Sequence, residues 1–301
     1  MKSFWGTFRA DVLLLLTAII WGFAFVAQRS SVTVIGPFAY NAARFALGAL
    51  ALAPLLWLGR LRKTRPARRG FGAGRKAAWA ALAGVVLFVA ANLQQIGMIT
   101  TTAGNAGFIT CLYVILVPVM SFCSGRSSSL RIWIGAALAL CGLYVLCIGA
   151  GFTMAPGDIL EFVGAFFWAG HILLINRLVS RMEALEIAVG QFAVCAALCW
   201  AVAMAREPAP FAGLIPAAIP ILYCGLLSTG VAYTLQIVAQ KTAHPAHASI
   251  ILSMEALFAS IGGVLLLKEP LTLRLLAGGV LMLAGMVLSQ LGPRPAGLEA
   301  P

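Results

Sequence analysis

Charged side chains are scarce in this sequence of 301 residues. Asp, Glu, Lys and Arg together make up 10% of it, whereas 61% of the residues are hydrophobic. Soluble globular proteins have about 25% charged and about 45–50% apolar residues. The shortage of charge excludes an ordinary soluble protein, and the excess of apolar residues predicts an all-α integral membrane protein that is embedded in the lipid bilayer.

The sequence also lacks the motifs of enzymes and of cofactor sites. We find no Ser-His-Asp order, HExxH motif, P-loop or pair of catalytic carboxylates at a workable spacing, so we expect neither an enzyme nor an ATP-driven pump, and no cofactor. The seven cysteines are odd in number and lie in or at the ends of apolar runs, which is typical of packing residues and not of a disulfide framework. His244 and His247 have a spacing seen in metal sites but no third ligand, so we expect no metal.

Long apolar runs are what the sequence has in abundance. A membrane-spanning helix needs about 20 apolar residues. Ten windows qualify, approximately 11–28, 37–58, 77–98, 102–123, 131–150, 157–178, 184–204, 214–239, 244–267 and 272–292. The first window lacks a small-residue cleavage site and is followed by nine more, so we interpret it as a permanent span and not as a signal peptide.

The basic residues are distributed unevenly between the two sides of the predicted membrane. If the N-terminus is cytoplasmic, sixteen Lys and Arg residues lie inside and four lie outside, and eight of the sixteen are in the loop between the second and third windows. The positive-inside rule therefore predicts both termini in the cytoplasm of a multi-pass cell (inner) membrane protein. The basic residues of these cytoplasmic loops, which retain the loops on the inner side of the membrane, explain the net charge of +12. We therefore expect no nucleic-acid partner.

The sequence contains an internal repeat of one unit. Thr102-Ala103 and Ala106 are echoed 140 positions later by Thr242-Ala243 and Ala246, each time between two apolar runs. Glycines recur every seven residues in the last window of each half, at Gly135, Gly142 and Gly149 and at Gly278, Gly285 and Gly292. Two repeats, 11–150 and 157–292, then hold five spans each, and an odd number makes the second copy inverted in a 5+5 arrangement. The glycines predict close packing between the halves or against another subunit, in a monomer or weak homodimer.

Several short motifs resemble the EamA branch of the drug/metabolite transporter superfamily over nearly the whole chain. They are Trp21, Arg44-Phe45, the Thr-Thr-Ala-Gly-Asn-Ala-Gly-Phe-Ile run at 101–109, Val117-Pro118, Ser253-Met254-Glu255-Ala256 and Leu267-Lys268-Glu269-Pro270. The resemblance implies a basket of ten helices in which spans 1, 3, 4, 6, 8 and 9 surround a central cavity. It also implies export of amino acids or other metabolites, without indicating which.

Four candidate residues are predicted to lie near the middle of the bilayer. Counting about 1.5 Å per residue along a helix, Trp21 and Glu255 lie about ten residues from the cytoplasmic face, and Arg44 and Trp168 lie seven to eleven residues from the outer face. Inverted-repeat transporters bind their substrates at this depth. We therefore expect a substrate site among these four residues.

Glu255 and Arg44 are the charged members of this group. An ionised acid at the membrane centre costs about 2.5–3.5 kcal/mol, so Glu255 must be paired, hydrated or protonated. Our hypothesis is that it contacts a substrate amine or carries a proton; the alternative is a structural partner, for which Arg44 is a candidate. Arg44 would hold a substrate carboxylate, or else extend toward the membrane surface or pair structurally.

The other candidate cavity residues are polar or aromatic. Trp21 with Phe25 and Trp168 would form an aromatic wall, although plain packing explains such spacing equally. His171 is either a gate or proton relay or a hydrogen-bonded structural group. The amides and tyrosines would bind a polar substrate, or else hydrogen-bond between helices; they are Asn41, Asn92, Gln95, Asn105, Tyr113, Tyr233 and Gln236.

These observations favour a secondary exporter of small amphipathic metabolites, in particular amino acids with apolar or aromatic side chains. An acid and a guanidinium suit the two charges of an amino acid, and the aromatic residues suit its side chain. The alternative is a multidrug or lipophilic-cation exporter in which Glu255 selects cations. The sequence leaves open whether the substrate gradient or protons drive the transport. A channel is disfavoured because the polar residues cluster near mid-depth and at helix ends and do not form a continuous stripe.

Overall fold

The computed structural model describes residues 2–61, 71–101, 103–125, 128–147, 155–267 and 273–290. This part of the chain is helical and contains no strand, as predicted. The helices are α1 (Lys2–Ser31), α2 (Pro37–Leu61), α3 (Ala73–Thr100), α4 (Ala103–Thr110), α5 (Tyr113–Cys123), α6 (Leu130–Cys147), α7 (Pro156–Leu178), α8 (Ala184–Arg206), α9 (Ala218–Leu222), the π-helix η1 (Tyr223–Ala232), α10 (Tyr233–Ala239), α11 (Pro245–Leu252), α12 (Glu255–Leu267) and α13 (Leu273–Gln290).

Most of the predicted spans are present as long apolar helices. Eight helical stretches of the described chain are long and apolar enough to cross a membrane, the first at Phe8–Ser31 and the last at Pro245–Leu266. Two shorter apolar stretches, Leu130–Val145 and Leu276–Ser289, coincide with the remaining two predicted windows. The protein is therefore a multi-pass membrane protein, whereas the count of ten spans stays a prediction.

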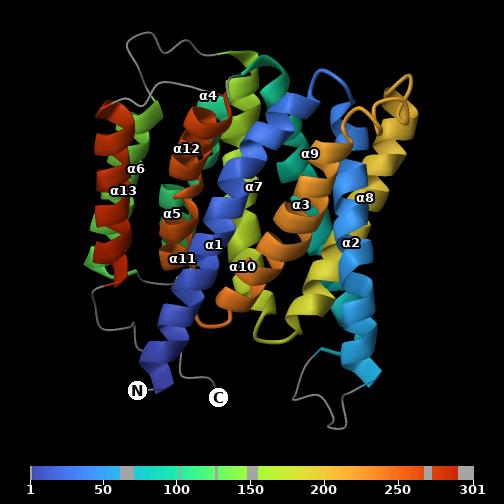
Figure 1. Cartoon of the computed structure of the whole chain (residues 1–301). Helices are drawn as coiled ribbons and strands as arrows, with labels where there is room; N and C mark the ends of the chain where they lie inside the picture. Colours follow the sequence, from blue (N-terminus) through green and yellow to red (C-terminus); the bar gives the residue numbers. More distant parts are fainter. Residues whose placement is uncertain are drawn as a thin grey trace.

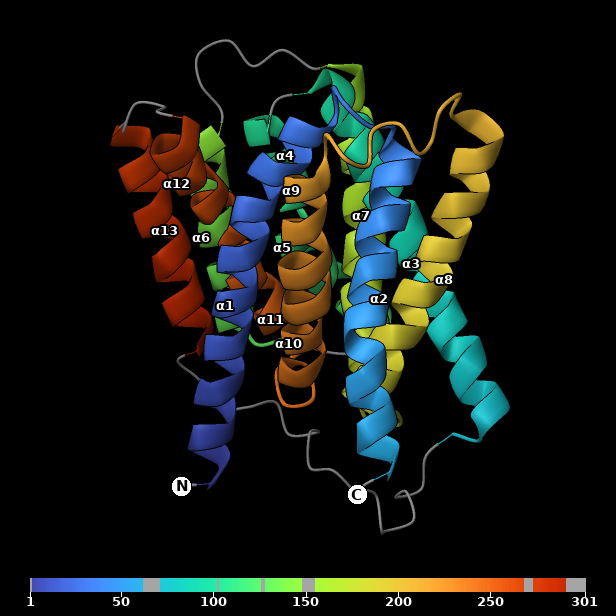
Figure 2. The same cartoon turned by 45° about the vertical axis from the view of Figure 1, so that its right-hand side comes forward.

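The helices form a bundle whose two edges differ. In Figure 1, α6 and α13 stand side by side at one edge, and α2 packs with α8 at the other. Figure 2 shows α1 crossing the bundle at a tilt, with α10 and α11 beside it. The helices α1, α3 and α7 contact neighbours on several sides, among them α12, α8 and α5. The middle of the bundle is thus enclosed by helices from both halves of the sequence.

Several helices begin at caps that the sequence supplies. The first N–H groups of a helix have no intrahelical acceptor and need another partner. Glu207, at the end of α8, accepts hydrogen bonds from the backbone N–H groups of Phe38 (2.8 Å) and Ala39 (3.1 Å) at the start of α2. In α7, the Asp158 carboxylate accepts a bond of 2.7 Å from the N–H of Ala155. These caps hold the far end of the bundle, opposite the end at which α1 begins.

Two of the predicted spans are broken near their middle, and the breaks face each other. The first break separates α4 from α5 at Cys111 and Leu112, and the second separates α11 from α12 at Ser253 and Met254. Ser253 Oγ donates to the carbonyl of Ile250 (2.8 Å), a local bond that competes with the helical ladder and bends helices. Cys111 Sγ in turn contacts the carbonyl of Ser253 (3.6 Å). Irregular backbone at membrane depth is tolerated only where protein or a cavity surrounds it.

A third irregular segment is η1, which has the wider π-helical hydrogen-bonding pattern for ten residues. Helix α1 donates two side-chain hydrogen bonds to carbonyl oxygens of this segment. Thr17 Oγ1 donates to Ala232 O (3.2 Å) and Trp21 Nε1 donates to Ser228 O (3.2 Å). π-Helical turns are frequent at functional sites, and these bonds fix the position of η1 against α1.

The glycine heptads pack α6 against α13. A Cβ atom added to Gly142 would lie 2.7 Å from the carbonyl oxygen of Gly278, and one added to Gly285 would lie 2.5 Å from that of Gly135. The two backbones therefore approach each other closely at these glycines. Of the two predicted roles, the structure shows packing between the two parts of the chain.

We expect Gly142→Ala to destabilise the protein. The new methyl group meets backbone atoms, which cannot rotate away, so we expect a cost of about 1–3 kcal/mol and a lower melting temperature in detergent. Gly170→Ala is the matched control, because a Cβ atom there meets nothing within 4 Å. Equal melting temperatures for the two variants would contradict the close seam.

Candidate functional site

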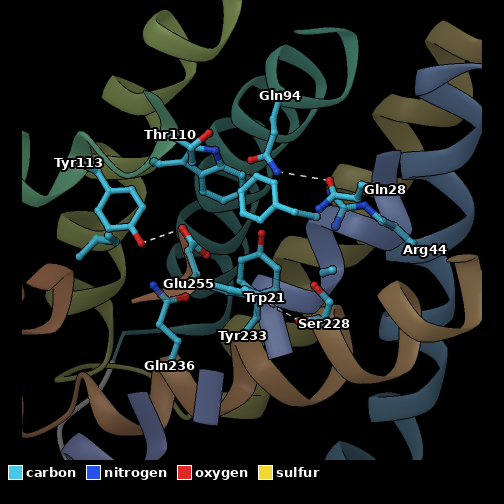
Figure 3. Close-up of a pocket in the computed structure, with 14 residues that line it drawn as sticks. Trp21, Gln28, Arg44, Gln94, Thr110, Tyr113, Ser228, Tyr233, Gln236 and Glu255 are labelled. Atoms are coloured by element: carbon cyan, nitrogen blue, oxygen red, sulfur yellow. Dashed lines mark hydrogen bonds between the residues drawn. The ribbon is translucent and has the colours of Figure 1, made fainter. Parts of the chain in front are cut away.

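A cavity lies in the middle of the bundle, between the broken helices and the π-helix. About 490 Å³ of space between the lining residues is not filled by protein atoms, and part of this space is open to the surroundings. Figure 3 shows the residues around it. They are Trp21, Ala24, Phe25, Gln28, Arg44, Gln94, Thr110, Tyr113, Trp168, Ile172, Ser228, Tyr233, Gln236 and Glu255.

Glu255 forms the acidic side of the cavity. It is the first residue of α12, where the partial positive charge of the helix N-terminus favours a carboxylate. Its Oε1 accepts a hydrogen bond of 2.8 Å from the hydroxyl of Tyr113, the first residue of α5, and lies 3.5 Å from Cys111 Sγ. The two broken helices therefore meet at this carboxylate, which is 4% exposed.

Arg44 forms the basic side, across the cavity from Glu255 (Figure 3). It is 2% exposed. Its Nε donates to Asn41 Oδ1 (2.7 Å), and Asn41 in turn donates to Asn92 Oδ1 (3.0 Å). The guanidinium lies 4.4 Å from the centre of the Phe45 ring. None of the ion pairs found in the described part of the chain includes Arg44 or Glu255.

Arg44 and Glu255 do not form an ion pair with each other in the structure. The sequence left open that these two residues form an ion pair with each other. In the structure, Glu255 is held by Tyr113 and Arg44 by Asn41. The guanidinium is thus positioned by neutral groups, and no carboxylate in the described part of the chain forms an ion pair with it.

An aromatic cluster makes up one wall of the cavity, with Tyr233 at its centre. The Tyr233 ring meets Trp21 edge-on, with 4.6 Å between the ring centres, and stacks with Trp168 at 6.3 Å. Figure 3 shows the Tyr233 hydroxyl pointing into the cavity between Glu255 and Arg44. The wall therefore offers both apolar surface and a polar tip.

Two polar atoms of the cavity lining have no hydrogen-bond partner among the described residues. They are Nε1 of Trp168, a donor, and Oε1 of Gln236, an acceptor, and both are buried. Buried polar groups in proteins are nearly always hydrogen-bonded. Unpaired groups at a cavity are therefore available to a bound molecule or to water.

Eight of the thirteen predicted site residues line the cavity, namely Trp21, Phe25, Arg44, Tyr113, Trp168, Tyr233, Gln236 and Glu255. Asn41 and Asn92 lie behind the wall and hold Arg44, as described above. Gln95 faces α1, where it donates to Ser31 Oγ (3.2 Å), and His171 bonds Gln191 (2.8 Å). The side chain of Asn105 lies outside the described residues.

Sequence reasoning missed several cavity residues. Gln94 Nε2 donates a hydrogen bond of 3.3 Å to Gln28 Oε1 at one side of the cavity. Gln28 follows Trp21 by seven residues, so the helical period that linked Trp21 to Phe25 would have found it. Gln94 carried no such signal, because it is next to Gln95 and only the rotation of α3 decides which amide faces inward. Thr110 and Ser228 also line the cavity.

His247 lies away from the cavity and has two partners of its own. Its Nε2 contacts Asp11 Oδ1 (2.8 Å) and its Nδ1 contacts Ser289 Oγ (2.9 Å), so it connects α11 with α1 and α13. Ser289 Oγ also donates to the carbonyl of Met286 (2.7 Å). Both ring nitrogens are thus engaged within the protein, and the histidine connects three helices.

The comparison with known families now identifies the chain. The profile of the EamA-like transporter family matches residues 8–148 and, a second time, residues 155–291. The chain belongs to the EamA-like transporter family. The resemblance that the short motifs suggested is thereby confirmed. The second span, which the resemblance did not place at the cavity, contributes Arg44.

Two relatives from Archaeoglobus fulgidus are each described as an uncharacterized transporter. One is 30% identical over 94% of this chain and 86% of its own length, and the other is 24% identical over 93% and 97%. A protein with a crystal structure superposes with a TM-score of 0.74 at 18% identity, covering 94% of this chain and 96% of that one. These comparisons support a transporter with this fold and do not specify its substrate.

We expect Tyr113→Phe to weaken the junction between the broken helices of this EamA-like transporter. It removes one hydroxyl group and leaves the Glu255 carboxyl without its closest donor, at a cost of about 1–3 kcal/mol. The melting temperature in detergent and the rate of transport should both fall. Tyr144→Phe, on an exposed residue of α6, is the control, and an unchanged Tyr113→Phe protein would disprove the importance of this bond.

Proposed function

We propose that this protein is a secondary exporter of small amphipathic metabolites, and that its substrates are amino acids with apolar or aromatic side chains. The observation that carries the proposal is the pair of opposite charges, Arg44 and Glu255, held on opposite sides of one aromatic cavity. An amino acid bears the complementary pair, a carboxylate and an ammonium group, on a single carbon.

The electrostatics favour a ligand with both charges. A charged side chain at membrane depth costs about 2.5–3.5 kcal/mol unless it is paired or hydrated. Because Arg44 and Glu255 do not neutralise each other, a zwitterion would satisfy both at once. The planar guanidinium suits a carboxylate, and Glu255 suits the ammonium group.

The walls of the cavity agree with an apolar or aromatic substrate side chain. Trp21, Trp168 and Tyr233 supply faces and edges on which a ring can pack. The unpaired Trp168 Nε1 and Gln236 Oε1 would orient the substrate by hydrogen bonds. Hydrophobic pockets separate similar apolar substrates only weakly, so we expect a panel of several amino acids to be accepted.

Transport would proceed by alternating access around this cavity, in a 5+5 inverted repeat of ten spans. The double match of the family profile and the pair of broken helices that face each other support this arrangement. Discontinuous helices at the repeat interface form the binding sites of many secondary transporters. The halves, 11–150 and 157–292, would rock against each other and expose the cavity to one side at a time.

A lipophilic-cation or multidrug exporter is the second candidate. It is favoured by the burial of Glu255 beside aromatic rings, because an acid in an aromatic cavity also binds organic cations. In this case Arg44 would be a structural residue that serves only to anchor Asn41. The two candidates differ in what they require of Arg44.

Counterflow in proteoliposomes distinguishes the two candidates. Vesicles loaded with an unlabelled amino-acid panel should accumulate labelled phenylalanine or tryptophan, with saturation. Arg44→Gln and Glu255→Gln should each weaken the apparent affinity by about tenfold to one hundredfold, since each removes a charge-assisted hydrogen bond worth about 1.5–3 kcal/mol.

Exposed charges supply the matched controls. Arg206→Gln and Glu183→Gln change the same side-chain types at exposed positions and should transport normally. If labelled amino acids never accumulate but a lipophilic cation does, and only Glu255→Gln abolishes it, the amino-acid proposal is wrong and the second candidate holds.

The membrane topology that we propose has both termini in the cytoplasm of the inner membrane. A cysteine at Ala209, between α8 and α9, should react with an impermeant maleimide added to intact cells, whereas one at Ser180, between α7 and α8, should react only after lysis. The unsubstituted chain measures the background from its native cysteines. The opposite labelling pattern would reverse the proposed orientation.

A further inference from the structure

A second buried acid, Glu161, lies just outside the cavity. It belongs to α7, one turn after Asp158, near the far end of the bundle, and it is 1% exposed. It does not line the cavity, and the proposed recognition of the substrate makes no use of it. The sequence contains only nine acidic residues, so a buried one inside the membrane needs an explanation.

The surroundings of Glu161 do not neutralise a negative charge. Its Oε2 accepts a hydrogen bond of 2.9 Å from Thr110 Oγ1, and its Oε1 has no partner in the described part of the chain. A Cβ atom added to Gly97 would lie 2.9 Å from this oxygen and 3.0 Å from the carbonyl oxygen of Gly157. Two acceptor oxygens thus border the same small space, and Glu161 Oε1 accepts no hydrogen bond from the described residues.

The charged and titratable groups around Glu161 do not alter this conclusion. On α7 itself, Asp158 has the same sign of charge and is occupied by Thr101 Oγ1 and the N–H of Ala155. From α1, Arg29 donates to the Met98 carbonyl of α3. Cys111 and Tyr113 lie beyond Thr110 and bond Glu255. The rest of the described chain on α4 and α5 adds only Cys123, at the end of α5.

A carboxyl group in such a place is stable when it carries a proton. The ionised form would be buried with one neutral donor and no cation, which is costly. A proton on Oε1 removes the charge and supplies the missing donor. There is little room for a metal ion, because Oε1 would already be 2.9 Å from a Cβ atom added to Gly97. The ligand that fits this site is therefore a proton.

One short segment connects this acid to the substrate cavity. Thr110, the last residue of α4, lines the cavity and donates to Glu161, and Tyr113, the first residue of α5, donates to Glu255. Both residues flank the break between α4 and α5. A movement of this break during alternating access would change the contacts of both acids together.

We propose that Glu161 is the proton-coupling site of this transporter. It takes up one proton from the outer side, keeps it while the break between α4 and α5 rearranges, and releases it to the inner side as the substrate leaves in the opposite direction. The inference rests on the proposed carrier function. It also rests on the proposed membrane topology, in which the far end of the bundle faces the outside. It assigns coupling to Glu161 and substrate binding to Glu255 and Arg44.

Counterflow and proton-driven uptake separate these two roles. Proteoliposomes of the unmodified protein should show counterflow of labelled phenylalanine at equal pH, and should also accumulate it when only a pH gradient is imposed. Glu161→Gln should keep counterflow within about twofold and lose the accumulation driven by the gradient. Glu183→Gln should keep both, because Glu183 is exposed.

Each other outcome has a defined meaning. Absence of counterflow by the unmodified protein, with amino acids and with lipophilic cations, would refute the carrier function itself. Counterflow without any response to the pH gradient, or a Glu161→Gln protein that still responds to it, would overturn only the coupling site. Glutamine and methionine both resemble a protonated glutamate in size. If neither Glu161→Gln nor Glu161→Met folded, the site would need a negative charge on Glu161. That result would also overturn the inference.

Discussion

The hydrogen bond from Tyr113 to Glu255 is the interaction on which the rest of this structure depends. It joins the first residue of α5 to the first residue of α12, where two interrupted helices meet. A break in a membrane helix leaves backbone groups without partners, and lipid offers none. The two breaks are stable because they face each other and a polar cavity, and the cavity exists because the helices are broken there.

The described ionisable side chains in and near the site do not form ion pairs with one another. Arg44 is held by Asn41, Glu255 by Tyr113, and Glu161 by Thr110, each a neutral partner. Stable membrane proteins commonly pair such charges with each other. Here the surrounding helices instead hold the ionisable groups apart, which costs stability and leaves them without charged partners in the described part of the chain.

Much of the fold could be predicted from hydropathy, because the bilayer constrains the length and composition of every span. The helical period also grouped Trp21 with Phe25 correctly and would have included Gln28. It could not choose between Gln94 and Gln95, since both are buried and adjacent, and only the rotation of α3 within the bundle turns one of them inward. The breaks at Cys111 and Ser253 carried no clear signal, because the apolar runs continue through them.

The sequence by itself determined that the chain is helical, lies in a membrane and belongs to the EamA-like transporters, because composition, apolar length and short motifs are local properties. Only the tertiary structure decided that Glu255 bonds Tyr113 and not Arg44, that Glu161 reaches the cavity through Thr110, and that His247 is held by Asp11 and Ser289. These partners are far apart in the sequence, and the packing angles and rotations of whole helices bring them together.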